Sequence, residues 1–328
     1  MKVSLILPLY DRRDAGCEQL RSALGQSVDR SSYEVVVVVG RLPGAPPAVD
    51  AQEAELLREC DAVVDFAGDP NRPDLEIPML LAGYARSTGD VLFFMEGHTV
   101  LDRNCCAMIA AHFRDNPGSR IGWAPRVHRN ATSLGSLIEQ HSRVHERLAH
   151  TRGGFWLGAN SFVSRDLFEE MGRLDPNYLR YSERAFLERV VRAKVEIGTL
   201  SAPLATHHDD MTFAQLVAVA DAAGQGKFKY YNSAGTGADS NPVRVRHWIY
   251  LLANRDASAL ILLPLALALG NTLLRVAIGL RRFNAGLAYR LFVPGLGFRD
   301  LSGFCSARIR AGRAARHARL NLASSRAK

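Results

Sequence analysis

Cysteine is scarce in this sequence, and its spacing fits no disulfide or zinc pattern. The 328 residues include five cysteines, and the adjacent pair Cys105 and Cys106 forms neither a zinc knuckle nor a CxxC redox motif. A disulfide-stabilised secreted domain is therefore not expected, and the thiols are predicted to be reduced, as in a cytosolic protein. With 47% hydrophobic and 23% charged residues, the composition also argues against a disordered chain and a many-span transporter.

The chain also lacks the glycine-rich loops of common nucleotide-binding folds. No GxGxxG follows a predicted strand, which argues against a dinucleotide-dependent dehydrogenase. The segment PLYDRRDAG carries arginines but no glycine cluster, which ranks a nucleotidyltransferase low. The opening MKVSLILPLY is too short and too soon polar for a signal peptide, so the main domain is expected to stay inside the cell.

Basic residues are concentrated in one part of the chain. Twelve of the 41 Lys and Arg lie between Arg275 and Lys328 beside a single acid, whereas the other 274 residues hold 29 bases and 32 acids. A basic face across the whole protein would have favoured nucleic acid, so no nucleic-acid partner is expected. A basic tail directly after an apolar segment favours an anionic lipid surface instead.

Apolar, β-branched segments alternate with helical patterns over the first hundred residues. The segments VSLILPLY, YEVVVVV and DVLFFM, with a shorter one at 62–66, are typical of buried parallel strands. Helical spacing separates them at 17–24, 51–58 and 78–87. This alternation predicts an α/β fold with a doubly wound, mostly parallel sheet, whose ligands bind at the carboxyl ends of the strands.

A long apolar segment follows where this alternation fades, after about residue 227. Residues 257–274 carry no charge and are at the lower length limit for crossing a ~30 Å hydrocarbon core. Pro264 and Asn271 weaken a span, so a span, a re-entrant hairpin, an interfacial helix and a buried core helix all stay open. The basic tail is expected to form a helix or to be disordered. The predicted parts are a main domain at 1–230, a linking helix at 231–256, and a membrane-associated hydrophobic segment with its basic tail at 257–328.

Four blocks of the sequence occur in the order and spacing of a known enzyme family. They are VSLILPLYDRR, STGDVLFFMEGHTVLDRN, GANSFVSRDLFEEMGRLDPNYLRYSERAFLERV and THHDD. Over roughly residues 1–230, the chain resembles the family 2 glycosyltransferases of the GT-A fold. The resemblance implies a nucleotide-sugar and acceptor domain, in which the second block takes the place of the strand that ends in the metal-binding DxD motif.

Two side chains that can bind a metal follow the predicted strand DVLFFM. Glu96 and His98 are two apart on an extended chain, so they point the same way, and Gly97 lets the backbone turn tightly. A carboxylate and an imidazole suit Mn²⁺ or another divalent ion that bridges a diphosphate, whereas Mg²⁺ prefers oxygen ligands and fits less well. By the resemblance, these residues match the first and last Asp of DxD. The alternative is a loop with a solvated Glu and a surface His.

A third metal ligand has to come from another part of the chain. His207 and His208 are adjacent after the apparent strand EIGTLSAPLATHH, and only one of two neighbours in an extended segment can point inward. We prefer His207, because its position after the strand matches the family's late histidine. The alternatives are His208 and a histidine-rich surface turn.

Inverting sugar transfer needs a carboxylate that takes the proton of the acceptor hydroxyl. Glu183 is expected in the first turn of a helix capped by Ser182, and it stands in the place of the family's catalytic Asp. A glutamate there also favours the helix dipole without a catalytic role. The resemblance further implies donor-binding residues, Pro8, Tyr10, Asp11, Gly40 and Asp69. On the acceptor side it implies Trp156, Gly158 and Asn160.

The sequence departs from the family at two donor positions. The strand YEVVVVV would end in an Asp that holds the uracil, but Gly40 and Arg41 follow it. Leu80 and Leu81 replace an expected Arg-Asn pair. The first hypothesis is a metal-dependent inverting glycosyltransferase that uses a nucleotide-sugar and a lipid-linked or cell-envelope glycan acceptor at the cytoplasmic face of the membrane. The second is a catalytically silent GT-A scaffold that organises an envelope-synthesis complex.

Overall fold

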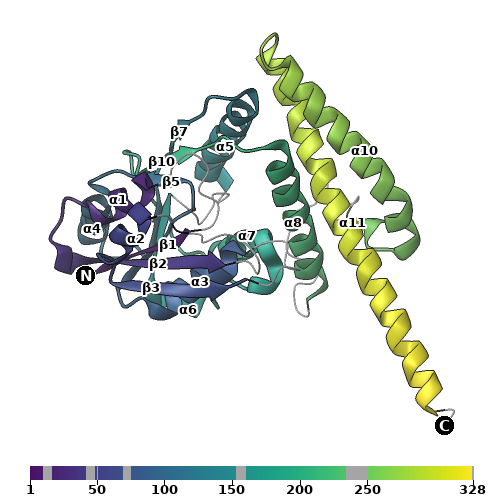
Figure 1. Cartoon of the computed structure of the whole chain (residues 1–328), viewed down its shortest axis with the longest axis horizontal. Coiled ribbons are helices and arrows are strands. Elements are labelled where there is room, and N and C mark those ends of the chain that lie inside the picture. Colours follow the sequence, from purple (N-terminus) through teal and green to yellow (C-terminus); the bar gives the residue numbers. More distant parts are fainter. Residues whose placement is uncertain are drawn as a thin grey trace. The chain divides into compact units, whose positions relative to one another are not determined.

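The computed structural model describes residues 1–9, 17–41, 49, 51–68, 75–152, 160–233, 250 and 252–326 (Figure 1). The chain forms two compact units. The first comprises Met1–Pro176 and Ser182–Met211, and the second comprises Asn177–Tyr181 and Thr212–Lys328. The second unit begins earlier than the predicted boundary at 230, because helix α8 (Phe213–Asn232) packs on the C-terminal helix α11 (Ala285–Arg326).

A seven-stranded mixed sheet forms the centre of the first unit. Its order is β3-β2-β1-β4-β8-β6-β9. The strands are β1 (Val3–Leu9), β2 (Tyr33–Arg41), β3 (Ala62–Ala67), β4 (Val91–Phe94), β6 (Ile121–Trp123), β8 (Ser161–Ser164) and β9 (Gly198–Thr199). β8 runs antiparallel to β4 and β6, and the other pairs are parallel. The predicted α/β fold with a mostly parallel sheet is confirmed.

Helices accompany this sheet in the first unit, and all except α5 (Ser133–Arg152) contribute residues to the cores on its two faces. They are α1 (Glu18–Leu24), α2 (Ala51–Leu57), α3 (Glu76–Arg86), α4 (Cys105–Asp115), α5, α6 (Arg165–Glu170) and α7 (Ser182–Arg192), with 3₁₀ turns at Arg30–Ser32 and Pro176–Tyr181. Within β1, Leu5 and Leu7 pack in the core that contains residues of α1 and α4, whereas Ile6 packs in the core that contains residues of α3, α6 and α7. A strand covered on both faces has no polar side, which explains why β1 is apolar at every position except Ser4.

A small three-stranded sheet, in the order β5-β10-β7, lies beyond the end of β4. Its strands are β5 (Thr99–Leu101), β7 (Val127–Arg129) and β10 (Ala205–His208). The segment EIGTLSAPLATHH, predicted to be one strand, is divided between the two sheets: β9 pairs with β6, and β10 pairs with β5 and β7. Pro203 lies in the connection, where the missing N–H of proline does not interrupt a ladder.

Glu34 is a buried carboxylate in the first half of β2, where it is 3% exposed. It accepts hydrogen bonds from Lys2 Nζ at 2.8 Å, Ser4 Oγ at 2.7 Å, Thr88 Oγ1 at 2.6 Å and the Gly89 N–H at 2.9 Å. Burial by itself raises the pKa of Glu34, but these donors outweigh it and lower the pKa to about 2. The carboxylate thus joins β1, β2 and the segment before β4.

Because the folded-state pKa of Glu34 is depressed, its contribution to stability is present above the ordinary pKa of 4.5 and is lost as the pH falls towards 2. We expect Glu34→Gln to lower the free energy of unfolding at pH 7, and to lower it by about 1 kcal/mol less at pH 3.5. Urea denaturation at both pH values measures this difference. Glu59→Gln, at an exposed position, is the control. Equal losses for Glu34→Gln at the two pH values would contradict the assignment.

The second unit is helical. Its long helices are α8, α10 (Asp256–Leu280) and α11, and Figure 1 shows α10 and α11 as an antiparallel hairpin. The basic tail, expected to be helical or disordered, is helical through Arg326. Among the described residues, α10 is the one helix long and apolar enough to cross a membrane. The linking helix predicted at 231–256 falls largely outside the described residues.

Candidate metal and active site

Glu96 and His98 lie in the turn that follows the carboxyl end of β4. The backbone N–H of Thr99 donates to the Glu96 carbonyl over 3.2 Å, and the side-chain amide of Gln19 donates to the same carbonyl over 2.7 Å. These bonds hold the turn against α1. The structure therefore places both residues at the edge of the sheet where α/β proteins bind their ligands, as the sequence predicted.

Strand β10 brings His207 to this turn. In the small sheet, His207 is paired in register with Thr99 of β5, and the backbone N–H of His208 donates to the His98 carbonyl over 3.1 Å. Side chains of neighbouring residues on a strand point to opposite sides, so only one of the two histidines can face Glu96. The one that does is His207.

Three potential ligand atoms converge in this cluster. Oε2 of Glu96 is 2.7 Å from Nε2 of His207 and 3.3 Å from Nε2 of His98, and the two Nε2 atoms are 2.8 Å apart. The side chains of Glu96, His98 and His207 are only 13%, 5% and 7% exposed. The two rings meet edge to face, with their centroids 4.4 Å apart.

These spacings suit a divalent cation. Ligand atoms at about 2.1 Å from one ion lie about 3 Å from each other when they are neighbours in its coordination sphere. Two imidazole nitrogens and a carboxylate oxygen that face one another in a buried site repel through their lone pairs, unless a proton or a cation lies between them. The mixed nitrogen and oxygen set suits Mn²⁺ better than Mg²⁺. The residues present therefore fit a metal of the predicted kind.

Arg126 supports the charged form of Glu96. Burial by itself raises the pKa of Glu96, but the positive charge of Arg126 and the contacts with His207 and His98 outweigh it and hold the pKa well below its usual range. Nη1 of Arg126 is 3.9 Å from Oε2 of Glu96, and Nη2 donates to Oδ1 of Asn160 over 3.2 Å. Asn160 in turn donates to the Ala124 carbonyl over 2.9 Å. Arg126 thus links the predicted metal turn to a predicted acceptor residue.

Asp209 orients two histidines from behind. Its Oδ1 is 3.0 Å from Nδ1 of His207, and its Oδ2 is 2.9 Å from Nδ1 of His128. Burial by itself raises the pKa of Asp209, but the hydrogen bonds with His128 and His207 outweigh it and lower the pKa to about 2. An ionised carboxylate only accepts, so Nδ1 of His207 carries a proton, which leaves Nε2 as the atom that faces the cluster and could bind a metal.

We expect Asp209→Asn to weaken Mn²⁺ binding by about 10- to 100-fold, because the tautomer and orientation of His207 are no longer enforced. Titration calorimetry measures the affinity, and a thermal melt checks the fold. Asp210→Asn is the matched control: Asp210 bonds the backbone N–H groups of Ala131 and Thr132 before α5, and its replacement should leave Mn²⁺ affinity unchanged. Equal affinities for Asp209→Asn and wild type would remove this positioning role.

Glu183 lies in the first turn of α7, as predicted, and is 7% exposed. The helix begins at Ser182, one residue earlier than expected, because the 3₁₀ turn Pro176–Tyr181 leads directly into it. Among the described residues, the groups of converging metal-ligand atoms do not include the carboxylate of Glu183. A role as base, separate from metal binding, stays a prediction.

The predicted donor and acceptor residues are only partly described. Pro8 lies near the end of β1 and is paired in register with Val38 of β2. Gly40 lies near the end of β2 and is paired in register with Phe66 of β3. A Cβ at Gly40 would lie 3.0 Å from the Met79 side chain, so the position is tightly packed. The remaining predicted residues lie outside the described residues: Tyr10, Asp11 and Asp69 for the donor, and Trp156 and Gly158 for the acceptor.

The sequence reasoning missed Arg126 and Asp209. Asp209 stands in the THHDD block beside the predicted ligand, and a carboxylate behind a metal-binding histidine is a common arrangement that could have identified it. Arg126 carries no comparable signal, because its contacts with Glu96 and Asn160 depend on how distant segments meet.

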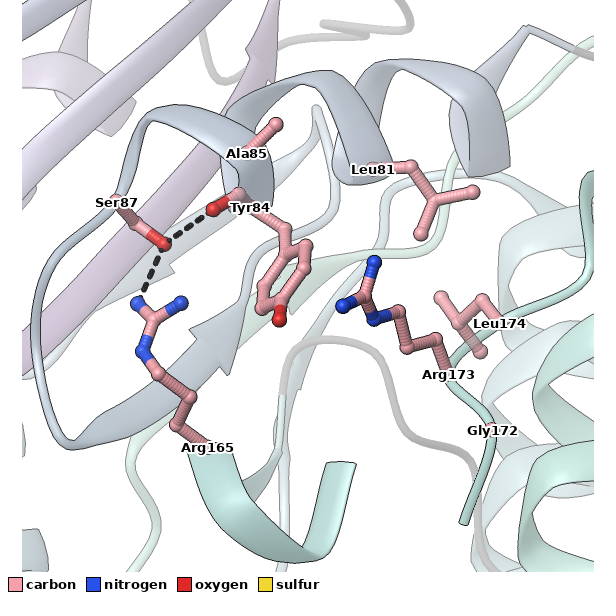
Figure 2. A pocket seen from close by; sticks show the side chains of 8 residues that line it. All are labelled: Leu81, Tyr84, Ala85, Ser87, Arg165, Gly172, Arg173 and Leu174. Carbon is pink, nitrogen blue, oxygen red and sulfur yellow. Dashed lines mark hydrogen bonds between the residues drawn. The ribbon is translucent and has the colours of Figure 1, made fainter. Parts of the chain in front are cut away.

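A separate pocket lies near the amino end of β4 and the carboxyl end of α3. It has a volume of about 540 Å³ and is lined by Leu81, Tyr84, Ala85, Ser87, Arg165, Gly172, Arg173 and Leu174. In Figure 2, the guanidinium groups of Arg165 and Arg173 flank the Tyr84 ring, at 5.1 and 5.2 Å from its centroid. Arg165 also donates to Ser87 Oγ over 2.8 Å. These contacts tie the end of α3 to α6 and include no residue of the metal cluster.

The fold matches solved enzyme structures at low sequence identity. The mannosyltransferase PcManGT from Pyrobaculum calidifontis, solved with GDP-Man and Mn²⁺, is 17% identical, with a TM-score of 0.52 over 95% of this chain and 86% of that chain. Residues 1–349 of S. aureus TarS, solved with UDP, are 13% identical, with a TM-score of 0.48 over 96% of this chain and 92% of that chain. No protein-family model and no curated protein sequence matches the chain. The likeness to PcManGT shows that the chain has the predicted GT-A fold.

Proposed function

We propose that this protein is an inverting, metal-dependent glycosyltransferase that moves a sugar from a nucleotide-sugar to a lipid-linked or cell-envelope glycan. The proposal is carried by the convergence of Glu96, His98 and His207 at the carboxyl end of β4. It is supported by the fold shared with a mannosyltransferase whose structure holds GDP-Man and Mn²⁺. A divalent ion held by these three side chains would neutralise the diphosphate that leaves the donor.

The transfer also needs a base that accepts the proton of the acceptor hydroxyl. Glu183 takes the proton of the acceptor hydroxyl while that oxygen forms a bond to the anomeric carbon. The bond between this carbon and the diphosphate oxygen breaks at the same time, so the nucleoside diphosphate leaves and the configuration inverts. Arg126 keeps Glu96 ionised, and Asp209 keeps Nε2 of His207 directed at the cluster.

The helices of the second unit support a location of the protein at a membrane. Helix α10 exposes large apolar side chains, among them Leu260, Ile261 and Leu265, and arginines follow it in α11. An enzyme carrying such a helix can reach acceptors held at a lipid surface. We therefore propose that it acts at the cytoplasmic face of the cell membrane, where its free cysteines would stay reduced.

A thermal-shift screen tests this function. UDP-GlcNAc, GDP-Man and other nucleotide-sugars are added with and without Mn²⁺, and a ligand at 100 times its Kd should raise the melting temperature by about 5 °C. We expect one donor to stabilise the protein, and to do so only with Mn²⁺. Stabilisation by no donor, or equal stabilisation without metal, would contradict the proposal.

A catalytically silent scaffold is the second candidate. Leu80, in the place of an expected polar donor residue, is buried in the core with Ile6 and Tyr84. Donor hydrolysis in the presence of Mn²⁺ separates the two functions, because a scaffold releases no nucleoside diphosphate. A hydrolysis rate equal to that of buffer would favour the scaffold.

A further inference from the structure

The exposed face of α10 is largely apolar, although Thr272 and Arg275 are also exposed between Leu269 and Val276. Leu260, Ile261, Pro264, Leu265, Leu269 and Val276 are exposed and recur at helical spacing. Ile261 is 71% exposed, although isoleucine is normally buried. From Leu260 to Val276 the face extends for about 24 Å along the helix. We call these six residues the apolar face of α10; a soluble protein rarely exposes such a stripe without a partner.

The opposite face of α10 packs against charged helices. Its buried residues include Ala266, Gly270 and Leu274, and a Cβ at Gly270, in the middle of α10, would lie 3.0 Å from the carbons of the Arg299 side chain in α11. Arg299 is 5% exposed and forms an ion pair with Asp221 of α8. Buried charge therefore lies beside the centre of α10.

More charge and close packing join the same helices. Lys227 of α8 forms an ion pair with Asp300 of α11, next to the Tyr250 hydroxyl. A Cβ at Gly224 of α8 would lie 1.8 Å from the carbonyl oxygen of Asp300, so the two backbones are in direct contact. The three helices pack as one bundle, and α10 cannot enter a bilayer along its axis without α11 and α8.

This packing argues against a span. If α10 crossed the membrane, Arg299, Asp221, Lys227 and Asp300 would be carried to the level of the hydrocarbon core. At that depth, the insertion of each charged side chain costs about 2.5–3.5 kcal/mol on the translocon-based scale, which gives the lowest values. If the bundle lies flat, only the apolar face of α10 enters the lipid, and these charges stay above it.

Arginines border both ends of the apolar face. Arg282 is exposed in the turn between α10 and α11, where Phe283 is 87% exposed. Arg308 and Arg316 of α11 lie 3.1 and 3.8 Å from Asp256, which brings them and the exposed Arg313 to the start of α10. Each arginine near an anionic surface contributes about 1 kcal/mol of binding. The arginines at both ends of the apolar face therefore favour a lipid surface that carries negative charge.

We infer that the helical bundle α8–α10–α11 docks in the plane of an anionic lipid surface through the apolar face of α10, and does not cross the membrane. The inference rests on the proposed function for its membrane setting. It is tested without donor or metal, so its failure leaves the thermal-shift result on nucleotide-sugars untouched.

Vesicle sedimentation tests the docking surface. The full chain is mixed with vesicles of phosphatidylcholine alone, or with 30% phosphatidylglycerol. We expect at least ten-fold tighter binding to the anionic vesicles, weakened by 0.5 M NaCl. Ile261→Glu with Leu265→Glu should reduce binding at least ten-fold with an unchanged melting temperature. The control Val63→Glu with Val191→Glu, at exposed positions of the first unit, should bind as wild type. No binding by wild type, or equal losses in both double variants, would overturn the inference.

Labelling at the two ends of α10 tests the orientation. Ala257→Cys and Phe283→Cys variants, bound to sealed vesicles, are exposed to a membrane-impermeant maleimide, and the labelling of wild type supplies the background of the five native cysteines. In-plane docking predicts that both positions are labelled from outside. Labelling at only one end would show a crossing helix and overturn the inference.

Discussion

Glu183→Gln is expected to lower the turnover of sugar transfer by about 10²- to 10⁴-fold. The amide keeps the size of the side chain in the first turn of α7 but cannot accept the proton of the acceptor hydroxyl. Since Glu183 belongs to no described group of metal ligands, Mn²⁺ affinity and donor-induced stabilisation should stay at wild-type values. Steady-state kinetics with saturating donor measures the loss.

A control on the same helix separates chemistry from folding. Glu188 lies on α7, where it pairs with Arg184 over 3.3 Å and with Arg192 over 3.9 Å. Glu188→Gln should change stability slightly and turnover by less than about two-fold, since i,i+4 pairs with exposed arginines on the same helix are worth about 1 kcal/mol or less. Near-wild-type turnover in Glu183→Gln would remove Glu183 from the role of base.

The double replacement of Glu96 and His98 by alanine is expected to reduce transfer by at least about 10³-fold. Loss of the cation leaves the departing diphosphate uncompensated, and removal of a single stabilising donor in other enzymes already costs 10²- to 10³-fold. Donor hydrolysis should fall in parallel, because both reactions need the same leaving group. A coupled assay for the released nucleoside diphosphate measures the two rates.

The chain contains a matched control for this variant. Glu139 and His141 repeat the same two residue types at the same spacing on α5, outside the described groups of metal-ligand atoms. Glu139→Ala with His141→Ala should retain transfer within a few-fold of wild type. Equal losses in the two double variants would mean that the effect arises from unfolding, and the metal role of Glu96 and His98 would then have no support.

The sheet was predictable because its strands carry strong local signals. β1 and β2 are apolar at nearly every position, as strands covered on both faces must be. The split of EIGTLSAPLATHH between two sheets was not predictable, because pairing with β6 or with β5 depends on distant segments. The same holds for α8, whose sequence continues the main domain but whose Gly224 fits against the backbone of α11.

The site residues that could be predicted are those identified by their type and by their position at a predicted strand. Glu96 and His98 follow a buried strand, and His207 lies in a short one, so their residue types and approximate positions brought them into the prediction. Asp209 and Arg126 act through other side chains, and their partners are set by the register of β10 beside β7 and by the approach of Arg126 to Asn160. β7 and β10 are far apart in the sequence, so their register depends on how distant segments pack.

The central claim is that Glu96, His98 and His207 hold one divalent cation. Calorimetric titration of Mn²⁺ into the wild-type protein and the Glu96→Ala, His98→Ala variant tests it most directly. The account predicts one site per wild-type chain and no measurable binding to the variant, with the Glu139→Ala, His141→Ala control indistinguishable from wild type. Unchanged Mn²⁺ affinity in the Glu96→Ala, His98→Ala variant would contradict it.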